Sequence, residues 1–280
     1  MSIFVTNASS DTTSITTSFD LESSREQLTN QTSEFFFGQN IALTNGSFED
    51  VTASGGNLHW PVAAAKVKVA STHAADTAAG LGLRSVEIHG LDATGAAIDE
   101  VIALNGTTAV ESVNSYVRLT LMHNEDVGTY GGSHQGTVTC RVTNATFASG
   151  ALLATMSGIE GAADSSVMFG YGEAQLGFTS IPLGKVAYIT RLEVVPTSAK
   201  PINVALYERD SLLTVAAPFV PRRIIWSADE MEAPVEKEFK SFIKIKPLAD
   251  LWFRAEGTVN SAGVSVYLDY YLVDENAGGT

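Results

Sequence analysis

The sequence predicts an all-β protein in which two β-sandwich or jelly-roll-like units follow an extended N-terminal arm, with little helix. Short runs of alternating apolar and polar residues recur along the chain, and this period of two is typical of half-buried strands. Clusters of Gly, Asn, Asp and Pro separate the runs, as in sandwiches and barrels. The length of 280 residues suits one large domain or two ordinary ones.

Residues 1–34 are predicted to form the arm, because they are rich in Ser and Thr and contain few large apolar side chains. Such a segment cannot bury enough apolar surface to offset the entropy that ordering costs. Two interpretations stay open, a flexible tail and an arm that becomes ordered on a neighbouring subunit. Ile3, Phe4 and Val5 form an apolar hook that suits the second interpretation.

The first β unit is predicted over residues 35–145. It opens with Phe35, Phe36 and Phe37, three adjacent rings that either mark the point where the arm meets a packed body or contact a partner. Residues 123–134 are polar and Gly-rich and predict a long hairpin loop. The remaining strands of this unit are predicted at 65–70, in the hairpin 84–110, at 116–121 and at 136–142.

The hairpin of residues 84–110 is the clearest local signal in the chain. Val86 and Ile88 alternate with polar neighbours, as in a strand with one buried face. Asp92 and Gly95 supply the turn, since an Asp side chain can cap it and Gly accepts a positive φ. The hairpin contains no nucleophile, ligand set or phosphate loop, so it predicts a scaffold element.

Residues 146–173 are interrupted by Gly and predict a crossover, in which the spacing of Leu152, Met156 and Ile159 allows a short helix. The second β unit is predicted over residues 174–280. Residues 229–239 are charged and interrupted by Pro234, which indicates a surface loop. The strands of this unit are predicted at 178–184, 185–195, 202–206, 242–246, 251–255 and 264–273.

The charge of the chain limits its partners. A formal net charge of −14 argues against binding to nucleic acid and to anionic membranes, both of which need basic surfaces. We expect no signal peptide and no membrane span, because no basic segment precedes an apolar run and no run reaches about 18 apolar residues. The single cysteine, Cys140, predicts a buried strand thiol rather than a disulfide.

The sequence contains no recognisable catalytic, cofactor or metal motif. The five histidines lack the i, i+4 spacing of a zinc helix and a second ligand cluster nearby, and His89 is expected on the solvent face of its strand. The turn at Asp92 lacks the ligand run of a calcium loop. Asp99 and Glu100 are adjacent on one strand and so point to opposite faces. We therefore expect no enzyme, no cofactor and no bound metal.

Residues 218–226 form the one stretch that combines basic and aromatic side chains. Arg222, Arg223 and Trp226 either meet an acidic partner surface, such as a second copy of this acidic chain, or belong to a Pro-bounded connection that enters a strand.

Two segments resemble structural proteins of tailed bacteriophages, a group frequent in marine and cyanobacterial phages. The first is Ser71-x-x-Ala-Ala-Asp-Thr-Ala-Ala-Gly80-x-Gly82-x-Arg84-x-Val86-x-Ile88-x-Gly90-Leu-Asp92, followed by Glu100-Val-x-x-Leu-Asn-Gly-Thr-Thr108. A phrase like Tyr116-Val-Arg-Leu follows, and Ile181-Pro-x-Gly184-Lys-x-x-Tyr188-Ile opens the second part. The resemblance covers roughly residues 60–195.

The resemblance implies a non-enzymatic virion protein, made in the host cytoplasm and carried in the phage particle. The leading hypothesis is a capsid decoration or cement protein that attaches to the major capsid protein through its arm, and trimeric self-association is the first expectation. Deleting residues 1–34 should then abolish attachment. A tail- or fibre-associated protein that binds receptors or glycans through Trp60, Tyr130, Trp226 or Trp252 is the alternative, and a polysaccharide depolymerase is a remote one.

Overall fold

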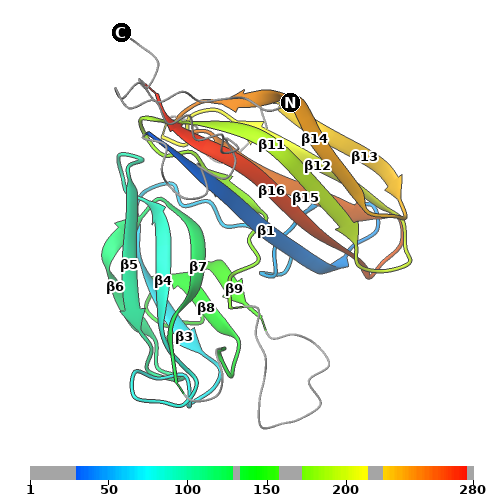
Figure 1. Cartoon of the computed structure of the whole chain (residues 1–280). Helices are drawn as coiled ribbons and strands as arrows, with labels where there is room; N and C mark the ends of the chain where they lie inside the picture. The colour runs from blue at the N-terminus through cyan, green and yellow to red at the C-terminus, as the bar shows by residue number, and fades with distance from the viewer. Residues whose placement is uncertain (1–29, 129–132, 158–171, 214–222, 276–280) are drawn as a thin grey trace, which may run out of the picture.

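The computed structural model describes residues 30–128, 133–157, 172–213 and 223–275 (Figure 1). Sixteen strands run through these ranges, and none of the described residues is helical. The predicted all-β class is therefore confirmed. Two β-sandwiches lie side by side, and we call them the terminal unit and the inserted unit.

The terminal unit contains strands from both ends of the described chain, arranged in two antiparallel sheets. We call the first, ordered β1-β16-β11-β14, the β1 sheet, and the second, ordered β10-β15-β12-β13 with β2 paired to β15, the β12 sheet. The β1 sheet consists of β1 (Gln31–Leu43), β16 (Ala262–Asp274), β11 (Lys185–Pro196) and β14 (Val235–Ile245). The β12 sheet consists of β10 (Phe178–Ser180), β15 (Asp250–Gly257), β12 (Ile202–Arg209), β13 (Arg223–Met231) and β2 (Glu49–Asp50).

The inserted unit contains all strands that lie between β2 and β10 in the chain, and Figure 1 shows it in cyan and green beside the terminal unit. Its two antiparallel sheets have the orders β6-β3-β8-β9 and β5-β4-β7. The first consists of β6 (Val110–Tyr116), β3 (Ala65–Ser71), β8 (Val138–Val142) and β9 (Leu152–Met156). The second consists of β5 (Ala97–Ala103), β4 (Leu83–Leu91) and β7 (Arg118–Val127).

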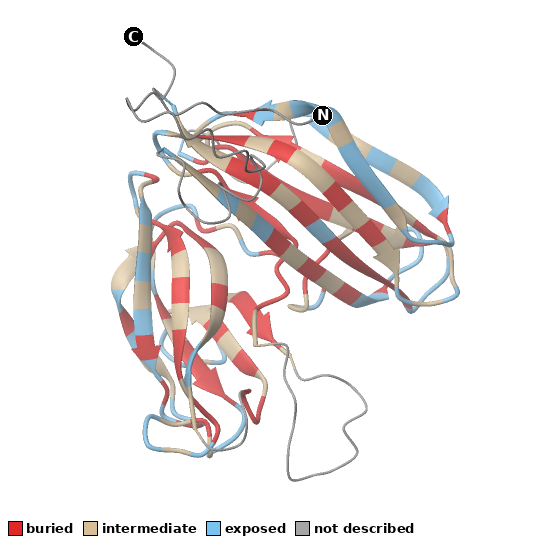
Figure 2. Cartoon of the chain, viewed as in Figure 1, coloured by how far each residue is buried: buried red, intermediate tan, exposed pale blue. Residues whose placement is uncertain are grey.

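Each sandwich has its own apolar core, visible as alternating buried positions along the strands (Figure 2). In the terminal unit Phe36, Leu268 and Phe253 meet between the sheets. The core of the inserted unit is completed by Phe178 and Trp252, which come from β10 and β15 of the terminal unit. The two units consequently share a buried boundary and do not simply touch at their surfaces.

The structure places residues 35–43 with the C-terminal half of the chain, although the sequence predicted that they open the first unit. β1 begins at Gln31, within the predicted arm, and pairs with β16 from Gln31↔Val273 to Leu43↔Ala262. Spacing along the sequence shows that a segment is a strand, but the partner of that strand depends on contacts that are distant in the chain.

The hairpin predicted from residues 84–110 is present as β4 and β5. Asp92 Oδ1 accepts hydrogen bonds from the backbone N–H groups of Thr94 and Ala96, at 2.7 and 3.1 Å. Gly95 has a φ of +84°, and a Cβ there would lie 2.2 Å from the Leu248 side chain. The positive φ requires a glycine in this turn, and a larger residue would also force the Leu248 side chain to move.

Three local predictions were wrong. Residues 123–127, expected in a loop, continue β7, and residues 152–156, a possible helix, form β9. The expected loop 229–239 consists mostly of β13 and β14, and only residues 232–234 connect them. These strands lie at sheet edges, where many of their side chains are exposed to water, and this exposure suits charged residues.

Candidate functional site

The boundary between the units is built around a buried carboxylate. Asp250, at the start of β15, is fully buried and accepts hydrogen bonds from Arg118 Nε and Nη2 at 3.1 and 3.2 Å. Arg209 and Ser180 donate to the same carboxylate. Arg118 comes from the inserted unit, and the other three residues come from the terminal unit, so this cluster ties the units together.

Trp60 covers the two buried guanidinium groups. The Cζ atoms of Arg118 and Arg209 lie 5.1 and 4.8 Å from its ring centroid, within cation–π range. Trp60 also makes edge contacts with Phe178 and Trp252, at centroid distances of 5.0 and 5.6 Å. Because these rings surround it, the ion cluster is shielded from water.

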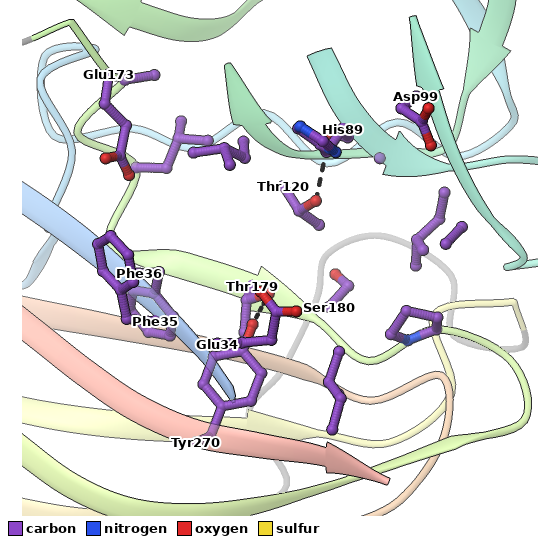
Figure 3. A pocket seen from close by; sticks show the side chains of 18 of the residues that line it. Glu34, Phe35, Phe36, His89, Asp99, Thr120, Glu173, Thr179, Ser180 and Tyr270 are labelled. Carbon is purple, nitrogen blue, oxygen red and sulfur yellow. Dashed lines mark hydrogen bonds between the residues drawn. The ribbon is translucent and has the colours of Figure 1, made fainter. Parts of the chain in front are cut away.

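A cavity of about 260 Å³ opens between the units (Figure 3). Its walls come from β4, β5 and β7 on one side and from β1, β10 and β16 on the other. Three carboxylates line it, those of Glu34, Asp99 and Glu173. The pKa of the Glu173 carboxyl is raised, because burial raises it more than the nearby His123 lowers it.

The outward face of the β1 sheet carries aromatic side chains. Phe35 is 60% exposed, whereas its neighbour Phe36 points into the core. Phe37 stacks on Tyr267 of β16 with ring centroids 4.9 Å apart, and Phe242 contacts Tyr271 at 6.1 Å. We call Phe35, Phe37, Tyr267, Tyr271 and Phe242 the outer aromatic face. The three adjacent Phe rings therefore do not act together. Phe36 belongs to the core, whereas Phe35 and Phe37 point outward.

The other predicted contact residues do not gather at one place. Ile3, Phe4, Val5, Arg222 and Tyr130 lie outside the described residues. Arg223 forms an ion pair with Glu208, and Trp226 packs against the terminal core while remaining partly exposed. Trp252 is only 4% exposed, and this burial argues against its use as a sugar platform.

Three side chains that the sequence analysis did not group together converge on β4 and β7. The Nε2 atoms of His89 and His123 are 3.2 Å apart. A carboxylate oxygen of Glu87 lies 3.4 Å from Nε2 of His123 and 3.8 Å from Nε2 of His89. The prediction that no histidine lies beside other potential metal ligands was wrong for this pair.

The cross-strand register explains why this cluster was missed. Glu87 and His89 are two residues apart on β4 and so share a face. Glu87 pairs directly with His123 of β7, but residues 123–134 had been read as a loop. The Glu-x-His spacing on a predicted strand was the one available signal.

Comparison with known proteins adds little. No protein-family model and no curated protein matches the chain. Among solved structures, an infectious bursal disease virus Gx strain structure aligns at 11% identity over 89% of this chain and 73% of that one, with a TM-score of 0.27. A broad bean stain virus structure aligns at 13% identity over 76% and 86%, with a TM-score of 0.21. Superpositions of this quality do not establish a shared fold.

Within the described ranges, no helix has the length and apolar character needed to cross a bilayer.

Proposed function

We propose that this chain is a non-enzymatic structural protein of a tailed-phage virion, a decoration or cement protein that attaches to the major capsid protein through its N-terminal arm. The outer aromatic face is the single observation that carries the proposal. It places large apolar side chains on the side of the β1 sheet that faces away from the core. The resemblance of residues 60–195 to phage structural proteins supports the same conclusion.

The position of β1 supports attachment through the arm. β1 is an edge strand of its sheet, and its first residue, Gln31, therefore lies at a sheet edge. An extended segment next to such an edge can add a strand to a neighbouring subunit, because main-chain hydrogen bonds alone provide the pairing. Ile3, Phe4 and Val5 would then provide apolar side chains for that contact.

We assign the outer aromatic face to a second copy of this chain, with a trimer as the preferred assembly. On the same face Arg191 forms ion pairs with Glu193, Glu236 and Asp269, at 2.9, 2.6 and 3.2 Å. Aromatic rings beside a mixed-charge network suit a contact that buries apolar area and still satisfies its polar groups. A trimer would allow three arms to reach the capsid together, and this multivalency would strengthen attachment.

Truncation tests the attachment. The deletion should end at residue 29, because removing residues up to 34 would also remove Gln31–Glu34 from their pairing with β16. The shortened protein should keep its far-UV circular dichroism and its cooperative unfolding but should no longer co-sediment with capsids that lack the protein. Undiminished co-sedimentation of a folded truncation would contradict the proposal.

A further inference from the structure

We propose that Glu87, His89 and His123 form a binding site for a zinc-class divalent ion, with the Glu87 carboxylate and the Nε2 atoms of both histidines as ligands. A bound ion would link β4 to β7. The link would lie at the wall of the cavity between the units, because His89 lines that cavity. His89 lines the same cavity as Phe35 and Phe37, but none of the three proposed ligands belongs to the outer aromatic face, and the occupancy of the site does not depend on how the protein attaches to a particle.

The three ligand atoms have the spacing that a small transition-metal ion requires. Their separations are 3.2, 3.4 and 3.8 Å. A circle through three points with these separations has a radius of about 2.0 Å, which equals the usual Zn–N and Zn–O bond lengths of about 2.0–2.2 Å. One position therefore lies at bonding distance from all three atoms.

The two imidazole rings approach each other through their ligand nitrogens. Their planes differ by 19° and their centroids are 5.3 Å apart. Because the Nε2 atoms are only 3.2 Å apart, the rings meet edge to edge through these nitrogens rather than face to face. A modest rotation of both half-exposed side chains toward Glu87 would direct the two lone pairs at a shared ion.

The tautomer of His123 is already the one that a metal requires. Its Nδ1 lies 3.0 Å from the carbonyl oxygen of Asn124. A carbonyl oxygen only accepts, so Nδ1 carries the proton in this contact, and the Nε2 lone pair of the neutral ring accepts the hydrogen bond from Nε2–H of His89 until an ion replaces that proton. Metal-bound histidines are commonly held by a backbone carbonyl in this way.

The ligand types select the class of ion. Two imidazoles and one carboxylate suit zinc and neighbouring transition metals, whereas calcium and magnesium prefer oxygen ligands. The side chains of Glu87, His89 and His123 are 24%, 38% and 29% exposed. A fourth coordination position is consequently accessible to water or to a small ligand.

Equilibrium binding to the full-length chain tests the site. The purified protein is stripped with a chelator and dialysed, then titrated with ZnCl₂, with MgCl₂ and CaCl₂ as ion controls. We expect one zinc per chain, no response to magnesium or calcium, and a rise in melting temperature with zinc. His89→Ala and His123→Ala should each weaken zinc binding more than about 100-fold, since even loss of an outer-shell partner costs about 10–100-fold.

The matched control is His73→Ala, which removes an exposed histidine outside the cluster and should leave zinc affinity unchanged. Absence of saturable zinc binding would overturn the proposal, as would equal affinity in His89→Ala, His123→Ala and the unaltered chain. If either variant fails to fold, the visible absorption of Co²⁺ added to the unaltered protein tests the site instead. The visible absorption of tetrahedral Co²⁺, removed by equimolar zinc, supports the site, and its absence overturns it.

Discussion

Arg118 and Asp250 form a two-point ion pair between the inserted and terminal units, with Nε–Oδ1 and Nη2–Oδ2 distances of 3.1 and 3.2 Å. The side chains are 1% and 0% exposed. The pKa of the adjacent Arg209 is lowered, because burial lowers it more than Asp250 raises it. The carboxylate therefore binds two buried cations, one from each unit, and ties the units together at their boundary.

Asp250→Asn should lower the free energy of unfolding by about 3–5 kcal/mol, because it removes the charged carboxylate that two buried guanidinium groups share. Urea denaturation followed by tryptophan fluorescence measures this change. The matched control is Asp269→Asn, which removes one exposed partner of Arg191 and should cost no more than about 1 kcal/mol. Equal losses in the two variants would contradict the role assigned to Asp250.

Phe35→Asp should disrupt self-association without unfolding the chain, because Phe35 is 60% exposed on the outer aromatic face. Sedimentation velocity should show a shift from oligomer to monomer, with an unchanged circular dichroism spectrum. Val101→Asp provides a control, since Val101 is 54% exposed and lies on β5 of the inserted unit, whereas the outer aromatic face belongs to the terminal unit. An oligomer that withstands Phe35→Asp but not Val101→Asp would place the contact on the inserted unit.

Cys140 should not react with thiol reagents in the native protein at pH 8. Burial raises the pKa of its thiol, so the thiolate is scarce, and the side chain is inaccessible. Reaction with a chromogenic disulfide should become stoichiometric in denaturant. Rapid stoichiometric labelling of the native chain would show that the core between β3 and β9 opens readily.

His134 should make the protein less stable as the solution is acidified. The His134 side chain is fully buried, and this burial lowers its pKa. The hydrogen bond between Nδ1 and the Gly136 carbonyl oxygen, at 2.6 Å, raises the pKa by less than burial lowers it. An unfolded histidine takes up a proton near pH 6.5, before the folded one does, so acid favours the unfolded state. The stabilising contribution is complete above pH 6.5 and declines as the pH falls toward the lower folded pKa.

Urea unfolding between pH 5 and 8 measures this decline, and His134→Gln should flatten it. The exposed His73 serves again as the control, since His73→Gln should leave the pH dependence unchanged. An identical slope in His134→Gln and the unaltered chain would assign the pH dependence to other groups.

Local chemistry in the sequence predicted much of the fold. The β4–β5 hairpin follows from alternation around Val86 and Ile88 together with the turn residues Asp92 and Gly95. These signals act over a few positions, so they are readable without tertiary information. Residues 229–239, which belong mostly to β13 and β14, were predicted as a loop because these edge strands carry many exposed charged residues, whereas residues 242–246 of the same region were predicted as a strand.

The sites depended on pairing between distant segments and were harder to predict. Nothing near Arg118 in the sequence indicates Asp250, which lies 132 positions away. Glu87, His89 and His123 come together only because β4 pairs with β7 in one particular register. Moving that register by one residue would put His123 on the opposite face, so ligand spacing alone could not reveal the cluster.

The pairing of β1 with β16 determines when the outer aromatic face can form on a newly made chain. The ribosome produces β1 first, and the whole inserted unit emerges before the partner strand does. The stacked pair of Phe37 and Tyr267 joins these two strands, so the outer aromatic face is incomplete on every nascent chain. Subunits still under synthesis therefore lack the complete surface that we assign to self-association.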